Sequence, residues 1–271
     1  MAGQSRSPQE RLDQLLVARG LAPTRTRAQA LVLAGRVFSD GTRLEKPGMR
    51  LSTGAPLHLL PGPRYVSRGG LKLVDALRRL GVSAAGRDAL DVGASTGGFT
   101  QVLLEAGAGR IVALDVGKGQ LDWNLRKDPR VQALEGINAR YLEPSLLPFL
   151  PQLVVMDVSF ISVEQVLPAV MACLLENGEV VVLVKPQFEV GRGKVGRGGI
   201  VRDPSLHRAV LRKIVSFVTA MQWPVAGIVR SPVKGAEGNV EFFLHLLSGG
   251  TSLAPEAQDQ AIESAVGEAI P

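Results

Sequence analysis

The sequence has a single cysteine, Cys173, and only three histidines among its 271 residues. A lone cysteine excludes an internal disulfide, and its apolar neighbours predict a buried thiol in a reducing compartment rather than a nucleophile. The histidines, His58, His207 and His245, lack the spacing of metal ligands. We therefore predict no metal site.

Long apolar runs are also missing. No stretch approaches the ~18 consecutive apolar residues from which a membrane-spanning helix is recognised. Residues 1–10 are polar and contain no apolar segment of the signal-peptide kind. These absences predict a cytoplasmic protein that requires no membrane. The 45% of apolar residues are nevertheless enough for a sizeable core.

Charge is unevenly distributed along the chain. Residues 1–64 contain ten Lys and Arg against four Asp and Glu, whereas residues 249–271 contain four acids and no basic residue. A basic segment before a nearly neutral body favours a polyanion-binding module joined to a second domain. A solvated basic face would give the same composition, so charge alone leaves both interpretations open.

A glycine-rich run at 91–100, Asp-Val-Gly-Ala-Ser-Thr-Gly-Gly-Phe-Thr, follows an apolar pair and precedes a helical pattern. Strand, glycine turn and helix in this order let a ligand approach the backbone. The spacing differs from the dinucleotide fingerprint and resembles the S-adenosylmethionine loop of Rossmann-like methyltransferases. An acidic residue about 20 positions later should bind a ribose. The candidate cofactor residues are Asp91, Gly93, Ser95, Thr96, Gly97, Gly98, Phe99 and Asp115.

From residue 67 onward, strand and helix patterns alternate. Near-continuous apolar runs, such as 180–184, indicate a mostly parallel sheet covered on both faces. We predict an α/β, Rossmann-like domain with seven strands. The expected strands are 88–92, 110–115, 130–135, 152–157, 179–185, 225–231 and 239–247. The expected helices are 69–80, 97–106, 120–126, 163–175 and 204–221.

Residues 8–60 have a separate organisation of two short helices and extended pieces. Arg-Leu-Asp at 11–13, Thr-Arg at 24–25, Gly-Arg-Val at 35–37, Asp-Gly at 40–41 and Lys-Pro-Gly at 46–48 resemble the S4 RNA-binding domain. Ser39 departs from the valine usual in that family. The resemblance implies that the helix pair holds structured RNA by its backbone. Arginine forks suit phosphates, and the candidates are Arg25, Arg27, Arg36 and Arg43.

Polar residues at strand ends are the next candidates, because ligands of open parallel sheets lie beyond the carboxyl ends of the strands. Asp157 and Lys185 end two such strands. Each could instead cap a helix or reach solvent. Glu241 lies in an apolar strand, where a carboxylate needs a cation beside it. We expect Lys185 to be that cation, with Lys72 as a second.

Lys72, Asp157, Lys185 and Glu241 occur in the order of the tetrad of FtsJ-type ribose 2′-O-methyltransferases. Longer sequence motifs narrow the resemblance to the TlyA family, also called haemolysins, over about residues 8–247. They are Ser-Arg-Gly-Gly at 67–70, Asp-Val-Ser-Phe-Ile-Ser at 157–162, Lys-Pro-Gln-Phe-Glu at 185–189, Gly-Gly-Ile-Val-Arg-Asp at 198–203 and Gly-Asn-Val-Glu-Phe at 238–242. The resemblance implies S-adenosylmethionine-dependent methylation of cytidine 2′-hydroxyls in ribosomal RNA, in one or both subunits.

A catalytic hypothesis follows from the tetrad. The acceptor hydroxyl must lose its proton during attack on the methyl carbon, and a lysine can accept it only when its pKa falls from the free value of ~10.4. We assign Lys185 as base, Asp157 as its orienting partner, and Lys72 and Glu241 as residues that position the ribose.

Residues 191–202 contain five glycines, four cations and no acid, directly after the strand that carries Lys185. A flexible surface loop is the simpler interpretation, but the position favours a loop that clasps RNA. Its candidates, with one from the start of the catalytic domain, are Arg192, Lys194, Arg197, Arg202 and Arg68. The expected domains are an S4-like domain (8–60), a linker (61–66), a methyltransferase domain (67–248) and an acidic, mobile tail (249–271).

Two rival functions remain at this point. The older family name suggests a pore-forming cytolysin, against which the lack of a signal segment, a membrane span and disulfides argues. The second rival function is that of a ribosome-assembly factor whose methyltransferase fold is inactive. The intact glycine loop and tetrad argue against it. The sequence identifies neither the modified nucleotide nor the oligomeric state.

Overall fold

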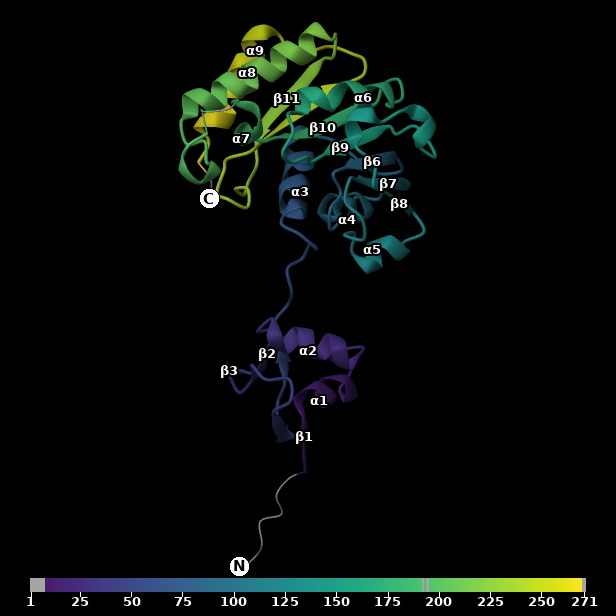
Figure 1. The fold of residues 1–271 in the computed structure, drawn as a ribbon, viewed down its shortest axis with the longest axis vertical. Helices are drawn as coiled ribbons and strands as arrows, with labels where there is room; N and C mark the ends of the chain where they lie inside the picture. Colours follow the sequence, from purple (N-terminus) through teal and green to yellow (C-terminus); the bar gives the residue numbers. More distant parts are fainter. Residues whose placement is uncertain (1–7, 192, 194, 270–271) are drawn as a thin grey trace, which may run out of the picture. The chain divides into compact units, whose positions relative to one another are not determined.

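A computed structural model describes residues 8–191, 193 and 195–269. The chain divides into two compact units, Met1–Arg64 and Tyr65–Pro271, each with its own hydrophobic core (Figure 1). Tyr65 is buried in the second unit, where its ring packs against Gly70. The two units are therefore described one at a time.

The first unit packs two helices beside short strands. β1 pairs antiparallel with β4, while β2 lies between β3 and β5. The second helix begins at the Thr24 cap predicted from the sequence, because the Thr24 hydroxyl accepts a hydrogen bond from the Arg27 amide. The elements are β1 (Gln9–Arg11), α1 (Leu12–Ala18), α2 (Arg25–Leu33), β2 (Val37–Ser39), β3 (Thr42–Arg43), β4 (Arg50–Ser52) and β5 (His58–Leu59).

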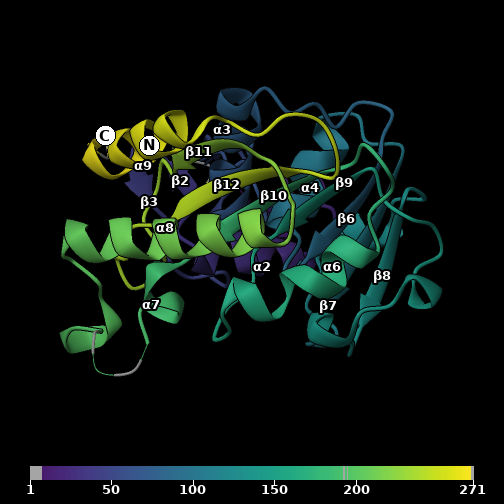
Figure 2. The same ribbon diagram turned by 90° about the horizontal axis from the view of Figure 1, so that it is seen from above.

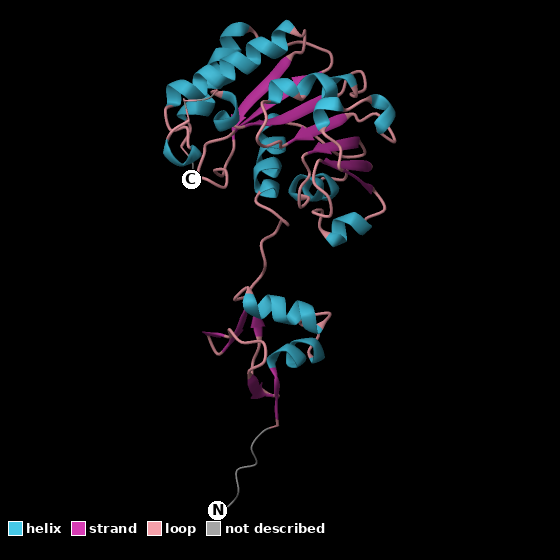
Figure 3. Cartoon of the chain, viewed as in Figure 1, coloured by secondary structure: helices cyan, strands magenta, loops and turns pink. Residues whose placement is uncertain are grey.

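The second unit alternates strands and helices, as its hydrophobic patterning predicts (Figure 3). Its elements are α3 (Gly69–Leu80), β6 (Asp88–Val92), α4 (Gly98–Glu105), β7 (Arg110–Asp115), α5 (Trp123–Lys127), β8 (Val131–Glu135), η1 (Ala139–Tyr141), η2 (Pro144–Leu146), β9 (Leu153–Met156), η3 (Val163–Gln165), α6 (Leu167–Ala172), β10 (Glu179–Val184), α7 (Pro186–Glu189), η4 (Arg197–Gly199), α8 (Pro204–Ala220), β11 (Val225–Arg230), β12 (Phe242–Leu247) and α9 (Pro255–Gly267).

These strands form one seven-stranded sheet in the order β11-β12-β10-β9-β6-β7-β8. The pairs from β10 through β8 are parallel, and β12 runs antiparallel between β10 and β11. The amino end of β12 therefore lies at the same edge of the sheet as the carboxyl ends of the parallel strands. This reversal brings Glu241, directly before β12, to the edge where parallel strands present their ligand-binding loops.

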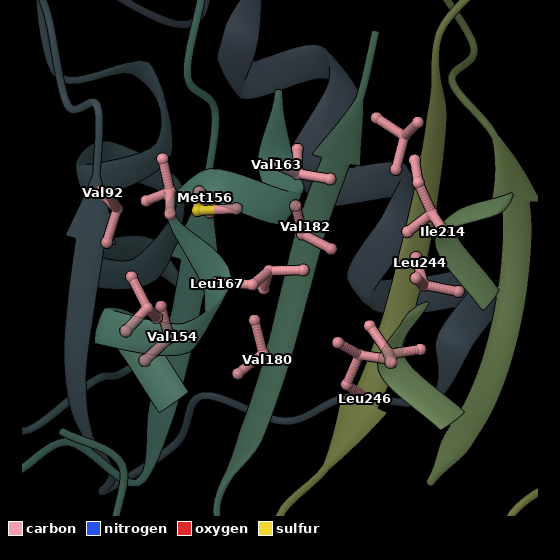
Figure 4. Close-up of a cluster of buried hydrophobic side chains, with 14 of the residues drawn as sticks. Val92, Val154, Met156, Val163, Leu167, Val180, Val182, Ile214, Leu244 and Leu246 are labelled. Carbon is pink, nitrogen blue, oxygen red and sulfur yellow. The ribbon is translucent and has the colours of Figure 1, made fainter. Parts of the chain in front are cut away.

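Both faces of the sheet are buried, which explains the continuous apolar runs of its strands. On one face, β9, β10 and β12 pack against η3, α6 and α8 (Figures 2 and 4). Figure 4 shows Val154, Val182 and Leu244 on that face, with Leu167 from α6 and Ile214 from α8. On the other face, α3 and α4 cover a second cluster that contains Leu73 and Phe243. The two cores fix the sheet edge that carries the polar residues.

Two sequence-based expectations about helices are wrong. The helix expected over 163–175 is divided into η3 and α6, because Pro168 has no N–H to continue the ladder through the first turn. Residues 249–271 were expected to be a mobile tail, yet Pro255–Gly267 form α9, which packs on α8 and β11. Ile262, Ala265 and Val266 are buried there, and this apolar stripe outweighs the acidic composition.

No helix within the described ranges is both long and apolar enough to cross a membrane.

Candidate active site

Four elements bring the predicted tetrad together at one edge of the sheet. Asp157 follows β9, Lys185 follows β10, Glu241 precedes β12, and Lys72 lies in the first turn of α3. Parallel strands end at the same edge, and β12 begins there because it runs in the opposite direction. Residues as far apart in sequence as 72 and 241 are thus in direct contact.

The loop after β9 holds the Lys185 side-chain nitrogen. Its Nζ lies 2.6 Å from Asp157 Oδ1 and donates a 2.7 Å hydrogen bond to Ser159 Oγ. The Lys185 residue is only 8% exposed, and Pro186 begins a helix directly after it. Its side chain is therefore fixed at the sheet edge by two partners. The orienting role predicted for Asp157 requires such a contact between its carboxylate and the Lys185 side chain.

The Glu241 carboxylate has a different cation from the one expected. Lys72 Nζ contacts Glu241 Oε2 at 2.5 Å, and both residues are buried. Burial raises the pKa of Glu241, while the charges of Lys72 and, more weakly, Lys185 oppose this rise. Lys72 is thus the direct partner and Lys185 the secondary one, because α3, which packs against α4 and β11, carries Lys72 to the carboxylate that precedes β12.

Three adjacent cavities meet at Ser159. A cavity of about 380 Å³ extends from Gly93 to Asp115 and Ile137, and one of about 200 Å³ lies against the glycine loop. A third, of about 290 Å³, is lined by Lys72, Lys185 and Glu241. A ligand in the first two cavities and another in the third would therefore meet beside Lys185. The arrangement therefore has room for two ligands side by side.

The glycine loop is organised by Asp115, the residue predicted to bind a ribose. Its Oδ2 accepts from the Ser95 amide at 2.8 Å and its Oδ1 from the Gly117 amide at 2.7 Å. Ser95 has a φ of +50°, and Gly93 has a φ of +85° with the Asp157 carbonyl 2.4 Å from where a Cβ would lie. Glycine at 93 is therefore required by both conformation and space. Gly93, Ser95 and Asp115 line the larger cavity, while Thr96, Gly98 and Phe99 line the smaller one.

Two predicted cofactor residues lie beneath the loop instead of lining these cavities. A Cβ at Gly97 would meet Leu125 at 2.3 Å and Leu121 at 2.8 Å, so this glycine makes room for α5 packing. Asp91 is fully buried, and its Oδ2 accepts a 2.6 Å hydrogen bond from the Thr100 hydroxyl. Both residues therefore contribute to the packing beneath the glycine loop: Gly97 against α5, and Asp91 between β6 and α4.

Asp91 gives a prediction about pH. Burial raises its pKa to about 7, so ionisation costs more in the folded protein than in the unfolded chain. Its contribution to stability is present at low pH and is lost as the pH rises from about 4 toward 7. Between pH 5 and pH 8, without cofactor, we expect wild type to lose of the order of 2 kcal/mol relative to Asp91→Asn. Urea unfolding of both proteins at each pH measures this difference. A constant difference would show that Asp91 does not titrate in this range.

The arginines proposed to contact RNA in the first unit differ in their surroundings. Asp13 is fully buried and accepts hydrogen bonds from Arg11, Arg25 and Gln29, so Arg25 also ties α2 to α1. Arg36 donates to the Leu60 carbonyl. Within the described part of the chain, the guanidinium of Arg27 makes no ion pair or hydrogen bond, although the Arg27 amide donates to the Thr24 cap. The remaining candidate, Arg43, lies 3.8 Å from Glu45.

The other candidate RNA contacts are only partly described. Arg68 is exposed and lines the same cavity as Lys72 and Lys185. Arg202 is exposed at the end of the basic loop, where Asn239 accepts from the Val201 amide and donates to the Gly199 carbonyl. Arg192 and Lys194 lie outside the described residues, as does the side chain of Arg197.

Sequence reasoning missed two side chains of the site. Ser159 contacts Lys185, and Glu189 accepts hydrogen bonds from the Ser162 hydroxyl and the Val163 amide. Both residues lie within sequence motifs quoted for the family resemblance, but the spacing of neither residue indicates a role. The available signal for Glu189 was a glutamate four residues after Lys185, directly beyond an apolar strand. In the described ranges, no group of three or more histidines, cysteines or acids is arranged to hold a metal.

Comparison with protein-family models finds two matches. Residues 65–247 match the FtsJ-like methyltransferase model, and residues 10–57 match the S4 domain model. The chain is 45% identical over 261 residues to the 16S/23S rRNA (cytidine-2′-O)-methyltransferase TlyA of Mycobacterium tuberculosis, which covers 95% of this chain and 97% of that protein. It is 37% identical to Hemolysin A of Brachyspira hyodysenteriae, over 88% of this chain and 99% of that one.

Solved structures agree with these matches. A "putative hemolysin" from Streptococcus thermophilus is 42% identical and covers 97% of this chain and 98% of its own, with a TM-score of 0.73. The N-methyltransferase NodS of Bradyrhizobium japonicum is only 13% identical, with a TM-score of 0.50 over 68% of this chain and 99% of its own. The latter likeness concerns the fold alone, and it is that of the second unit's methyltransferase sheet.

Proposed function

Since the chain belongs to the TlyA family of S4-domain, FtsJ-like methyltransferases, we propose that it methylates the ribose 2′-hydroxyl of a cytidine in ribosomal RNA, with S-adenosylmethionine as methyl donor. The observation that carries the proposal is the buried contact of Lys185 with Asp157 and Ser159 at the point where three cavities meet. A pore-forming or purely structural role would not require this arrangement.

The larger cavity fits the proposed cofactor. Leu114, Ile137 and Val158 give it apolar walls suited to a purine, and the Asp115 carboxylate lies at its edge as an acceptor for ribose hydroxyls. Gly93 lets a ligand approach the backbone. When bound, S-adenosylmethionine supplies an electrophilic methyl group. We assign its retention to Gly93, Ser95, Thr96, Gly98, Phe99 and Asp115.

The residues of the third cavity act on the acceptor. Lys185, in its neutral amine form, accepts the proton of the 2′-hydroxyl as that oxygen bonds to the methyl carbon, and Asp157 with Ser159 aims its Nζ. Lys72 and Glu241 contact each other in the same cavity, where an ammonium and a carboxylate can donate to and accept from ribose oxygens. The protein's contribution is alignment and removal of the proton.

One experiment tests the activity directly. Purified protein is incubated with S-adenosylmethionine and separated ribosomal subunits, and 2′-O-methyl sites are mapped by mass spectrometry of the digested RNA. We expect a new 2′-O-methylcytidine in at least one subunit. Absence of any methylated ribose in either subunit, with cofactor binding intact, would refute the proposal.

The cofactor assignment gives a further prediction. Asp115→Ala removes two hydrogen bonds that shape the loop at Ser95 and Gly117, as well as the ribose acceptor. We expect S-adenosylmethionine binding, measured by calorimetry, to weaken at least ~10-fold, because one charge-assisted hydrogen bond contributes about that much. Asp88→Ala is the control, since Asp88 pairs with Arg110 at the opposite end of β6. Equal affinities for both variants would contradict the assignment.

A further inference from the structure

Glu189 connects the segment that carries Lys185 to the loop that carries its partners. The residue is 6% exposed and ends α7, four positions after Lys185. Its Oε2 accepts a 2.6 Å hydrogen bond from the Ser162 hydroxyl, and its Oε1 accepts a 2.8 Å bond from the Val163 amide. Ser162 and Val163 close the loop that begins at Asp157.

The loop and α7 are therefore joined at both ends. At one end Lys185 Nζ contacts Asp157 and Ser159, and at the other Glu189 holds Ser162 and Val163. Between them, the rings of Phe160 and Phe188 lie 5.2 Å apart. These contacts and the chain between them close a ring that includes Asp157, Lys185 and Glu189.

The loop needs such a restraint. Phe160 has a φ of +64°, a conformation that costs a non-glycine residue free energy and persists only where its surroundings enforce it. Val163 is 2% exposed, so water cannot replace the carboxylate as the partner of its amide. Burial raises the pKa of Glu189, and the hydrogen bonds from Ser162 and Val163 oppose that rise. The packing of α7 alone does not explain why an acid with this desolvation cost is buried at position 189.

We propose, resting on the methyltransferase function above, that Glu189 is a positioning residue that holds Asp157 and Ser159 against Lys185 through its two hydrogen bonds to the end of their loop. It touches neither the cofactor cavities nor the acceptor cavity. Its effect on methyl transfer is indirect, through the geometry of the base.

The test uses the full chain with saturating S-adenosylmethionine and enzyme in excess over RNA. Glu189→Ala should lower the single-turnover rate roughly 10²-fold, the cost of a small misplacement of catalytic groups. Glu189→Gln should recover most of the rate, since its oxygen accepts from Val163 and its amide donates to the Ser162 hydroxyl. Ser162→Ala, a milder change, should give a smaller loss. In the double variant, the rate reduction caused by Ser162→Ala should not add to the reduction caused by Glu189→Ala.

Glu164→Ala is the matched control. Glu164 lies on the same short helix as Val163 but pairs with Lys213 of α8, at 2.6 Å. Its removal should leave the single-turnover rate unchanged, although it deletes an acid from the same element. All rates are compared below the thermal midpoint of each variant, so that loss of folded protein does not enter.

Hydrogen exchange provides a second measurement that does not depend on activity. In Glu189→Ala, amides of residues 157–163 should exchange faster, while those of the buried strand β10 should not. An unchanged loop, or a glutamine variant as slow as the alanine variant, would overturn the proposal. If wild type transfers no methyl group but the exchange difference is present, the restraint stands and the proposed function fails.

Discussion

Methyl transfer by Lys185→Ala should fall by at least ~10²-fold, the lower end of what a positioned acid–base group contributes. The side chain is held by Asp157 and Ser159 and lines two of the three cavities that meet at Ser159. Binding of S-adenosylmethionine and of ribosomal RNA should stay close to normal, because Asp115 and the S4 unit are untouched. A single-turnover assay separates the chemical step from binding.

Lys185→Arg distinguishes a base from a fixed positive charge. Arginine keeps its charge and cannot accept a proton near neutral pH, so it should not rescue the rate. Lys213→Ala is the matched control, since Lys213 is a half-exposed lysine paired with Glu164 away from the cavities. An arginine variant near the parent rate would show that Lys185 only orients or neutralises charge. The base would then be sought in solvent or Asp157.

The second large effect concerns the S4 unit. A fragment that begins at Pro61 should bind S-adenosylmethionine normally, because Tyr65 and the whole methyltransferase core are retained. It should methylate ribosomal RNA at least roughly 10²-fold less efficiently in kcat/KM, since it loses most of the basic segment and its phosphate contacts. Calorimetry and RNA methylation at fixed salt measure the two properties separately.

A chain that lacks only residues 1–7 is the control for this truncation. It retains the two helices, the short strands and the buried Asp13 cluster of the first unit. Its methylation should match that of the full chain. If the Pro61 fragment modifies RNA as well as the full chain does, the methyltransferase domain finds its substrate unaided, and the RNA-binding role of residues 8–60 is wrong.

Several features of the site were predictable because their signals are local. A glycine turn between an apolar run and a helix predicts the cofactor loop, and Asp115 ends the next strand in the expected register. The apolar runs around Asp157 and Lys185 place both at carboxyl ends of buried strands. The tetrad order came from family resemblance, which specifies residues and not contacts.

Pairing within the site could not be predicted in the same way. The sequence favoured Lys185 as the partner of Glu241, yet Lys72 occupies that place and Lys185 turns to Asp157. The choice depends on how α3 crosses the sheet, a packing result that involves residues 169 positions apart. Gly97 was expected to face a ligand, but it faces Leu125. The spacing of glycines along the sequence does not show which side chains pack beneath the loop.

The two units, the order of strands along the chain, the glycine loop and the residue types at the strand ends were predictable without a structure, because each depends on periodicity or on residues close together. Four features emerge only from the folded chain: which cation neutralises which acid, the burial of Asp91 beneath the loop, the packing of α9 on α8 and β11, and the hydrogen bonds that join Glu189 to the loop after β9. These depend on contacts between distant segments. Their free energy comes from burial and hydrogen bonds formed after the sheet is assembled.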